Sequence, residues 1–183
     1  GLFWIGRRDF GPIALELGAR YDRNDVDVAD DAGAPDRDFD TTSASAALRW
    51  DISEDFHLSV GVDRAQRAPT PEELYSDGFH VATDSFEFGS VDLDVETANR
   101  AELGLHWHRG PLKVSASVYQ ARFDDFIFLA GTDIEAEEPV RVWTQADARF
   151  TGAEAEIDWT FLDTGDDRFG LRVFGDTVRA RLD

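Results

Sequence analysis

The chain has 183 residues, a formal net charge of −20 at pH 7 and no cysteine. Its acidic balance, with no basic patch, argues against a nucleic-acid partner, and the lack of cysteine excludes a disulfide framework and a thiolate metal site. No stretch approaches the ~18 to 20 apolar residues of a transmembrane helix, so a membrane span would have to be made of strands. The chain starts with neither Met nor a signal peptide, and we therefore expect a mature protein or a fragment.

Alternation of apolar and polar residues predicts a series of β-strands, because successive side chains of a strand point to opposite faces. A first strand is expected at residues 2–8. The clearest alternation follows at residues 12–22, where one face holds Ile13, Leu15, Leu17, Ala19 and Tyr21. The same pattern recurs at residues 43–52, 56–63, 101–108 and 152–161, and a last strand is expected at residues 169–182. The sequence predicts about eight strands in all.

Two architectures fit such two-faced strands. In a soluble sandwich the apolar faces pack together, whereas in a membrane barrel they face lipid and the polar faces line a lumen. The strands look about 10 to 14 residues long, which suits a tilted membrane strand, and aromatic residues stand near their ends, as at membrane interfaces. Glu154, Glu156 and Asp158 occupy alternate positions, which suits a water-filled lumen. We therefore predict an all-β fold, an antiparallel transmembrane β-barrel.

The lengths of the connections predict the orientation of the strands. Short connections are expected at residues 9–11, 53–55, 109–111 and 163–167, and longer ones at residues 23–41, 67–96 and 131–139. Bacterial barrels have short periplasmic turns and long extracellular loops. The first strand should therefore run toward the periplasm, and the strand that starts at Ile13 should run outward.

The long connection at residues 67–96 carries a resemblance to a known family. Residues 67–75, RAPTPEELY, look like the segment that follows a barrel strand in TonB-dependent receptors, and residues 76–89, SDGFHVATDSFEFG, resemble the zinc-uptake branch of that family. Shorter segments that resemble the family are LDVETANRAELGL at 93–105, VY at 118–119, FDDFI at 123–127, FTGAEAEI at 150–157 and GDTVRARL at 175–182. The resemblance covers most of the chain.

The resemblance implies a barrel of about 22 strands around an N-terminal plug, in an integral receptor of the Gram-negative outer membrane. Such receptors bind a scarce solute and import it with energy passed through TonB. This chain shows no plug, no TonB box and no terminal aromatic residue, so we expect residues 1–183 to be a partial barrel domain. Its expected partners are outer-membrane lipid, the TonB complex through the missing plug, and a small solute or metal ion. About eight strands could also close a small barrel of their own, which would remove two open edges.

The resemblance favours zinc or another divalent metal as the transported ligand, and it implies no required cofactor. A siderophore or vitamin receptor of the same family is the alternative. A passive pore or a surface adhesin is an alternative of another class, because a barrel without a plug would be native for those proteins. We do not expect an enzyme: Asp124 and Asp125 could be cast with lumen histidines as an acid–base pair, but no nucleophile motif stands out.

His80 is the first candidate metal ligand. It lies in the connection expected at the cell surface, with Asp77, Asp84 and Glu87 nearby in sequence, and an imidazole with carboxylates can bind zinc. By resemblance to the zinc-uptake branch, we expect His80 to be a ligand, with Glu87 second and Asp84 as a further candidate. The alternative is that His80 only packs within its loop.

His57, His106 and His108 form a second candidate set. The alternation places all three on the predicted lumen face, near the periplasmic ends of two neighbouring strands. Directly opposed positions bring Cβ atoms to within about 5 Å, so three imidazoles could bind a transition metal or contact the plug. The alternative is a polar lumen wall in which these histidines have no special role.

An acidic segment occupies the first long connection. It holds Asp25, Asp27, Asp30, Asp31, Asp36, Asp38 and Asp40, diluted by Arg23 and Arg37. The glycine and closing glutamate of a calcium-binding EF-hand are absent, so we interpret the segment as a solvated surface loop. Its field would still concentrate cations and repel anions, which favours a cationic ligand over an anionic siderophore.

Overall fold

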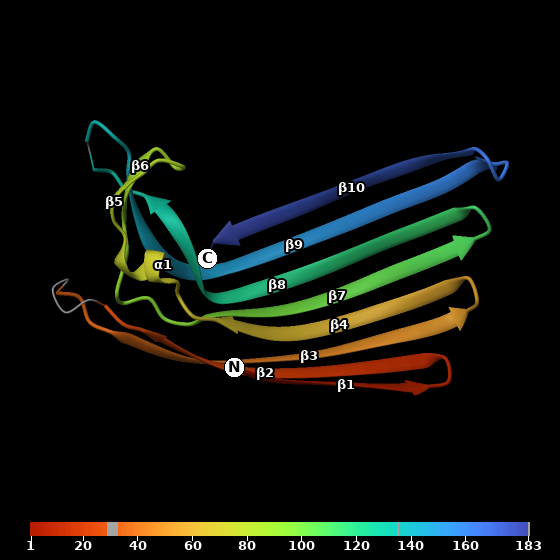
Figure 1. The fold of residues 1–183 in the computed structure, drawn as a ribbon, viewed down its shortest axis with the longest axis horizontal. Helices are drawn as coiled ribbons and strands as arrows, with labels where there is room; N and C mark the ends of the chain where they lie inside the picture. The colour runs from red at the N-terminus through yellow and green to blue at the C-terminus, as the bar shows by residue number, and fades with distance from the viewer. Residues whose placement is uncertain (29–32, 135, 183) are drawn as a thin grey trace.

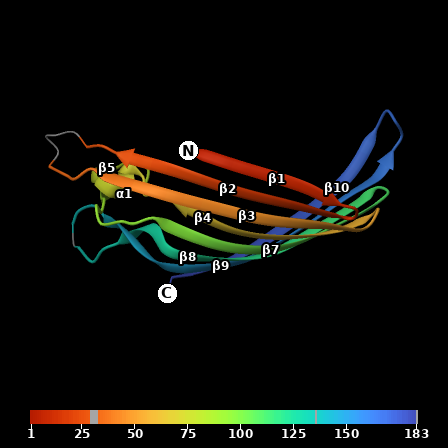
Figure 2. The same ribbon diagram turned by 90° about the horizontal axis from the view of Figure 1, so that it is seen from below.

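Eight long strands form one curved antiparallel sheet in the computed structural model, which describes residues 1–28, 33–134 and 136–182 (Figure 1). The strands are β1 (Leu2–Phe10), β2 (Ile13–Val26), β3 (Arg37–Ser53), β4 (Phe56–Arg67), β7 (Glu96–Arg109), β8 (Leu112–Gly131), β9 (Val140–Asp163) and β10 (Arg168–Leu182). Each pairs with the next along the chain, and within the described residues β1 pairs only with β2 and β10 only with β9. The sheet is therefore open at two edges and bends along its length (Figure 2).

The connections separate cleanly to the two ends of the sheet. Tight turns at residues 11–12, 54–55, 110–111 and 164–167 define the short-turn end, and the connections 27–36, 68–95 and 132–139 define the long-loop end. Gly11 and Gly110 have φ angles of 63° and 56°, which glycine adopts without strain. The predicted alternation of short and long connections is confirmed. The first long connection is shorter than predicted, because β2 and β3 continue into it.

The connection between β4 and β7 contains three short elements that the alternation did not predict. They are α1 (Pro71–Tyr75), β5 (Asp77–His80) and β6 (Ser85–Phe88). β5 and β6 form a hairpin, and β6 pairs in parallel with the start of β9, Phe86 opposite Val140. In the described residues the sheet thus has ten strands rather than about eight. Strands of four residues are too short for a period of two to be recognised.

The two faces of the sheet differ as the sequence predicted. One cross-strand row joins directly paired residues Leu15, Leu48, Val60, Leu103, Val118 and Ala153. Large apolar side chains on this outer face stay exposed; Leu103 and Val118, for example, retain about half of their accessible surface. The opposite, inner face carries mainly polar and charged side chains. No helix in the described part of the chain is long and apolar enough to span a membrane.

The buried core lies at the long-loop end rather than along the sheet. Phe39, Leu74, Leu93 and Ile127 are each at most 5% exposed and pack together, with Trp143 against them. Phe39 and Ile127 come from β3 and β8, whereas Leu74 lies in α1. Burial of these side chains holds the connection 68–95 against the wall of the sheet. The loop is therefore a packed part of the fold and positions the residues on it.

Candidate functional site

The β5–β6 hairpin brings His80 and Glu87 together. His80 Nδ1 lies 3.5 Å from Glu87 Oε1, and the hydroxyl of Thr83 donates a hydrogen bond to the same carboxylate oxygen. Glu87 is 6% exposed, whereas more than half of the His80 side chain is accessible. The hairpin thus holds a buried carboxylate under an accessible imidazole, two donors that suit a divalent metal.

The other acidic residues of this loop do not complete a metal site. Asp84 occupies the turn between the strands with a φ of 49°, and Asp77 begins β5. Within the described residues, no three His, Cys, Asp or Glu side chains converge as a metal-binding group would. The structure therefore places His80 and Glu87 side by side, and the assignment of His80, Glu87 and Asp84 as ligands stays a prediction.

An ion-pair network anchors the loop that carries this hairpin. Both carboxylate oxygens of Glu73 accept hydrogen bonds from Arg67 Nη1, at 3.0 and 2.8 Å, and Glu96 Oε2 accepts one from Arg67 Nη2 at 3.1 Å. Glu73 is also the third residue of a capping box with Thr70, which starts α1. Burial acts to lower the pKa of Arg67, but the hydrogen bonds to Glu73 and Glu96 outweigh it and raise the pKa above its ordinary value.

The alternation and motifs of the sequence do not reveal this network as a whole. The spacing Thr70-Pro71-x-Glu73 is a recognisable helix start. It predicts α1 and the capping contact between Glu73 and Thr70. The contact between Arg67 and Glu96 could not be predicted, because it joins residues 29 positions apart. The network therefore fixes the loop above the sheet in a way that only the fold reveals.

Three histidines gather on the inner face at the short-turn end. His57 pairs directly with His106, and the ring centroids of His57 and His108 lie 5.6 Å apart, against 6.5 Å for His57 and His106. His57 Nδ1 is 3.3 Å from Asp51 Oδ1 but is not aligned for a hydrogen bond, and this buried nitrogen has no hydrogen-bond partner among the described residues. The predicted proximity is thus present, without three donors converging on one point.

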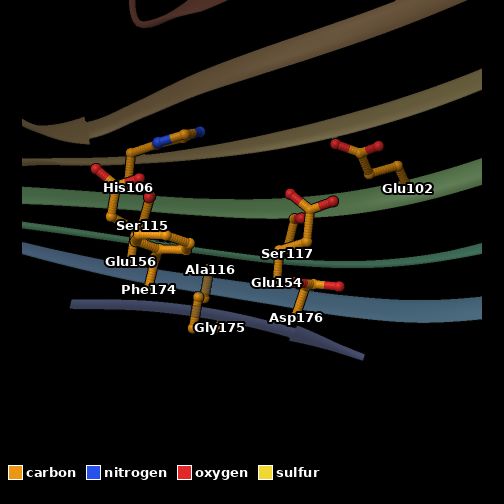
Figure 3. A pocket seen from close by; sticks show the side chains of 11 residues that line it. Glu102, His106, Ser115, Ala116, Ser117, Glu154, Glu156, Phe174, Gly175 and Asp176 are labelled. Atoms are coloured by element: carbon orange, nitrogen blue, oxygen red, sulfur yellow. The ribbon is translucent and has the colours of Figure 1, made fainter. Parts of the chain in front are cut away.

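The surroundings of these histidines are strongly charged. One hollow of about 590 Å³ is lined by the three histidines together with Lys113, Glu156, Asp158 and Arg172, and Arg172 Nη2 donates to Glu156 Oε2 at 2.7 Å. Figure 3 shows the neighbouring hollow of about 500 Å³, where Glu102, His106, Glu154 and Asp176 project from the same side of their strands. The inner face is therefore polar and mainly acidic around these hollows, which suits a water-filled lumen.

The two ends of the acidic segment are strands rather than a loop, because β2 and β3 remain paired there. Asp25 in β2 pairs with Asp38 in β3, and Arg23 Nε donates to Asp25 Oδ1 at 2.9 Å. This hydrogen bond lowers the pKa of Asp25, and a hydrogen bond with Asp25 raises the pKa of Asp38. Asp30 and Asp31 lie outside the described residues.

Asp124 and Asp125 form an irregularity in β8. The register of β8 with β9 shifts between Phe123 and Phe126, and Asp125 has a φ of 58°. Gln145 Nε2 donates to the carbonyl of Asp125 at 2.9 Å. The two aspartates therefore mark a β-bulge near the long-loop end, whereas the inner-face histidines lie at the short-turn end, so the structure does not join them as an acid–base pair.

The sequence of the chain matches the model of a known protein family. Residues 1–180 match the sequence model of the family described as TonB dependent receptor-like, beta-barrel. The chain belongs to this family. Proteins of the TonB-dependent receptor family are outer-membrane β-barrels, so the predicted barrel class is confirmed at the level of the family. The zinc-uptake branch is not distinguished by this match.

Solved structures share the fold. The FrpB iron transporter from Neisseria meningitidis is 17% identical, with a TM-score of 0.71, over 98% of this chain and 25% of its own. The hemophore receptor HasR of Serratia marcescens, solved with its hemophore HasA and heme, is 18% identical with a TM-score of 0.72, over 96% of this chain and 33% of its own. The copper transporter OprC is 21% identical with a TM-score of 0.66, over 82% of this chain and 24% of its own. The chain thus spans 24% to 33% of the length of these proteins.

Proposed function

We propose that this chain is a section of the wall of a TonB-dependent outer-membrane receptor that binds a scarce solute at the cell surface and imports it. The observation that carries the proposal is the family match over residues 1–180. The two-faced sheet supports it, because the exposed apolar face suits lipid and the charged inner face suits a water-filled lumen. Energy would reach the receptor from TonB through a plug that occupies that lumen.

The orientation follows from the two ends of the sheet. Barrels of this kind keep short turns in the periplasm and long loops outside. The short-turn end, with the three inner-face histidines, is therefore periplasmic in the proposal. The long-loop end, with α1 and the β5–β6 hairpin, faces the medium and would meet the solute first.

Zinc or another divalent metal is the proposed cargo. The support is the pair of His80 and Glu87, which are 3.5 Å apart on the outward hairpin, together with the acidic charge of the chain, which attracts cations. Other loops of the complete receptor would supply the remaining ligands. Proteins of similar fold are named as transporters of copper and of iron. A siderophore or vitamin is the alternative cargo, and a passive pore or adhesin is the alternative class.

Calorimetric titration of zinc into the full-length receptor in detergent tests the proposal, with a ferric siderophore and cobalamin as competitors. We expect saturable zinc binding that neither competitor displaces. The variants His80→Ala and Glu87→Gln should weaken it by about 10-fold or more, because even the partners of metal ligands contribute about 10- to 100-fold to metal affinity. The variant His106→Ala serves as the comparison. Loss of binding in His106→Ala alone would assign the metal to the inner face, and absence of zinc binding would leave the siderophore or vitamin as the cargo.

A further inference from the structure

Four arginines gather on the outer face of the sheet, where the apolar belt ends. Arg122, Arg149 and Arg181 stand directly opposite one another on β8, β9 and β10, and Arg179 lies two positions from Arg181 on the same face. We name these four residues the arginine cluster. Figure 1 shows the three strands side by side, with the C-terminal end of β10 pointing toward the long-loop end.

The arginine cluster is electrostatically unusual for this chain. Like charges on directly opposed strand positions destabilise a sheet, because the Cβ atoms are only about 5 Å apart. Within the described residues, no arginine of the cluster forms a salt bridge, although the protein has 38 Asp and Glu residues against 18 Lys and Arg residues. The same-face carboxylates Asp124 and Asp147 lie beyond the arginines, near Asn99 and the backbone of Asp125. Among the residues that the structure describes, the cluster therefore has no anionic partner.

The height of the cluster is set by the register. Arg149 lies ten residues along β9 from Trp159, and the cross-strand partners of Trp159, Leu112 and Leu171, are likewise ten residues from Arg122 and Arg181. Ten residues of strand rise about 33 Å, which at a tilt of about 40° gives a height of about 25 Å, the thickness of the apolar band of a barrel. If Trp159 marks one membrane interface, the arginines lie at the other.

The surface beneath the cluster suits lipid chains. Val118 and Ala153 are paired on the same outer face directly below it, and a hollow of about 580 Å³ is lined by Val118, Thr151, Thr177, Arg149, Arg179 and Arg181. An acidic solute in the lumen would meet Glu102, Glu154 and Glu156 on the opposite face and could not reach these arginines through the sheet. The cluster thus faces the membrane and not the transport path.

We propose that Arg122, Arg149, Arg179 and Arg181 bind the phosphate group of a lipid headgroup in the outer leaflet, with its acyl chains along the apolar rows below. Guanidinium groups match phosphate oxygens with two parallel hydrogen bonds, and opposed arginines on adjacent strands can share one phosphate. The bound anion would remove the repulsion between the arginines. The inference goes beyond the proposed cargo and depends only on the orientation of the barrel in the membrane.

Binding of lipid A to the full-length receptor in detergent micelles tests this site, measured by titration with a fluorescent lipid A that keeps both phosphates. The variant Arg149→Gln/Arg181→Gln removes two charges of the cluster. We expect it to weaken binding about 30-fold, because each basic residue near an anionic membrane surface contributes about fivefold. The matched control is Arg8→Gln/Arg109→Gln, which removes two exposed outer-face arginines at the short-turn end and should bind like the wild type.

Each alternative gives a distinct result. Lipid A stripped of its phosphates should bind both the wild type and the cluster variant equally weakly, and Arg149→Lys/Arg181→Lys should retain part of the affinity. Equal loss in the cluster variant and the control would overturn the proposal, as would phosphate-independent binding. Displacement of lipid A by inorganic phosphate at millimolar concentration would assign the site to a free anion instead. Heat-dependent gel mobility of each variant shows that the barrel is folded, so that lost binding reports on the site.

Discussion

Glu96 ties the long connection between β4 and β7 to the wall of the sheet, and its removal should loosen that connection locally. Glu96 is 8% exposed. Its Oε2 accepts hydrogen bonds from the amide of Ile127 at 2.9 Å and from Arg67 Nη2 at 3.1 Å. The Ile127 amide depends on this carboxylate because the pairing of β8 with β7 ends at Asp124, opposite Thr97. The variant Glu96→Ala therefore leaves a buried donor without a partner.

The expected magnitude follows from these two contacts. An unsatisfied buried amide costs about 1 to 3 kcal/mol, and Arg67, which is partly exposed and keeps Glu73, adds at most about 1 kcal/mol. We expect the free energy of local opening to fall by about 2 to 3 kcal/mol, so that the amide of Ile127 exchanges about 30 to 150 times faster. Glu96→Gln keeps an acceptor for that amide and should cost only about 1 kcal/mol, or a factor of about 5.

Hydrogen exchange of the full-length receptor in detergent measures this effect in peptides that cover residues 126–130. Glu102 offers a matched control on the same strand, because its ion pair with Arg100 is exposed and should contribute little. The reasoning fails if Glu96→Ala exchanges no faster at residues 126–130 than Glu102→Ala does. It also fails if exchange increases equally along the lower part of β8, because the strand itself would then have opened.

Three further variants probe the packing of the same loop. Leu74→Ala should destabilise the loop by about 3 kcal/mol, because Leu74 is 1% exposed and its truncation leaves a cavity. Limited proteolysis should then cut residues 68–95 faster. The control Val81→Ala, at an exposed site, should leave the cleavage rate unchanged. Gly89→Ala places a Cβ 2.5 Å from the backbone of α1 and should cost about 2 kcal/mol, seen as a similar rise in cleavage. Thr70→Ala removes the cap of α1 and should lower the local stability by about 1 kcal/mol, measured by hydrogen exchange of the amides at residues 72–76. Thr70→Ser keeps a capping hydroxyl and should retain the protection of these amides.

The strands could be predicted from the sequence because one face is apolar at every second position. The prediction ended too early in β2 and began too late in β3, where Asp25 pairs with Asp38. Val26 and Phe39 are the apolar residues of these extensions, and two isolated positions are too few for a period of two to be recognised. The β5–β6 hairpin is not predicted for another reason: its strands have only four residues each, too few for a recognisable alternation, and the pairing of β6 with β9 joins residues far apart in the chain.

The contacts within the candidate sites can be predicted from the sequence to different extents. The proximity of His57 and His106 follows from the regular alternation and from the short turns beside each residue, which place both at the same end of neighbouring strands, and the structure pairs them directly. The contact between His80 and Glu87 depends on the hairpin register, in which His80 pairs with Ser85, and no pattern in the sequence sets that register. The arginine cluster needed the pairing of three strands, since Arg122, Arg149 and Arg181 lie far apart in the chain.

On β8 and β9, the two faces of the sheet change character at the height of the arginine cluster. Below it, the outer face carries Val118 and Ala153, and the inner face carries charges such as Glu156. Above it, the inner side of these two strands carries aromatic residues, of which Phe123 and Phe126 lie 5.1 Å apart by ring centroids, while the outer side carries Asp124 and Asp147. A sheet with water on both sides gains no stability from an apolar outer face of limited height. A lipid layer of limited thickness does stabilise such a face. In the proposed orientation, we expect this reversal at the upper boundary of the membrane, where an arginine aimed outward can bind a lipid phosphate.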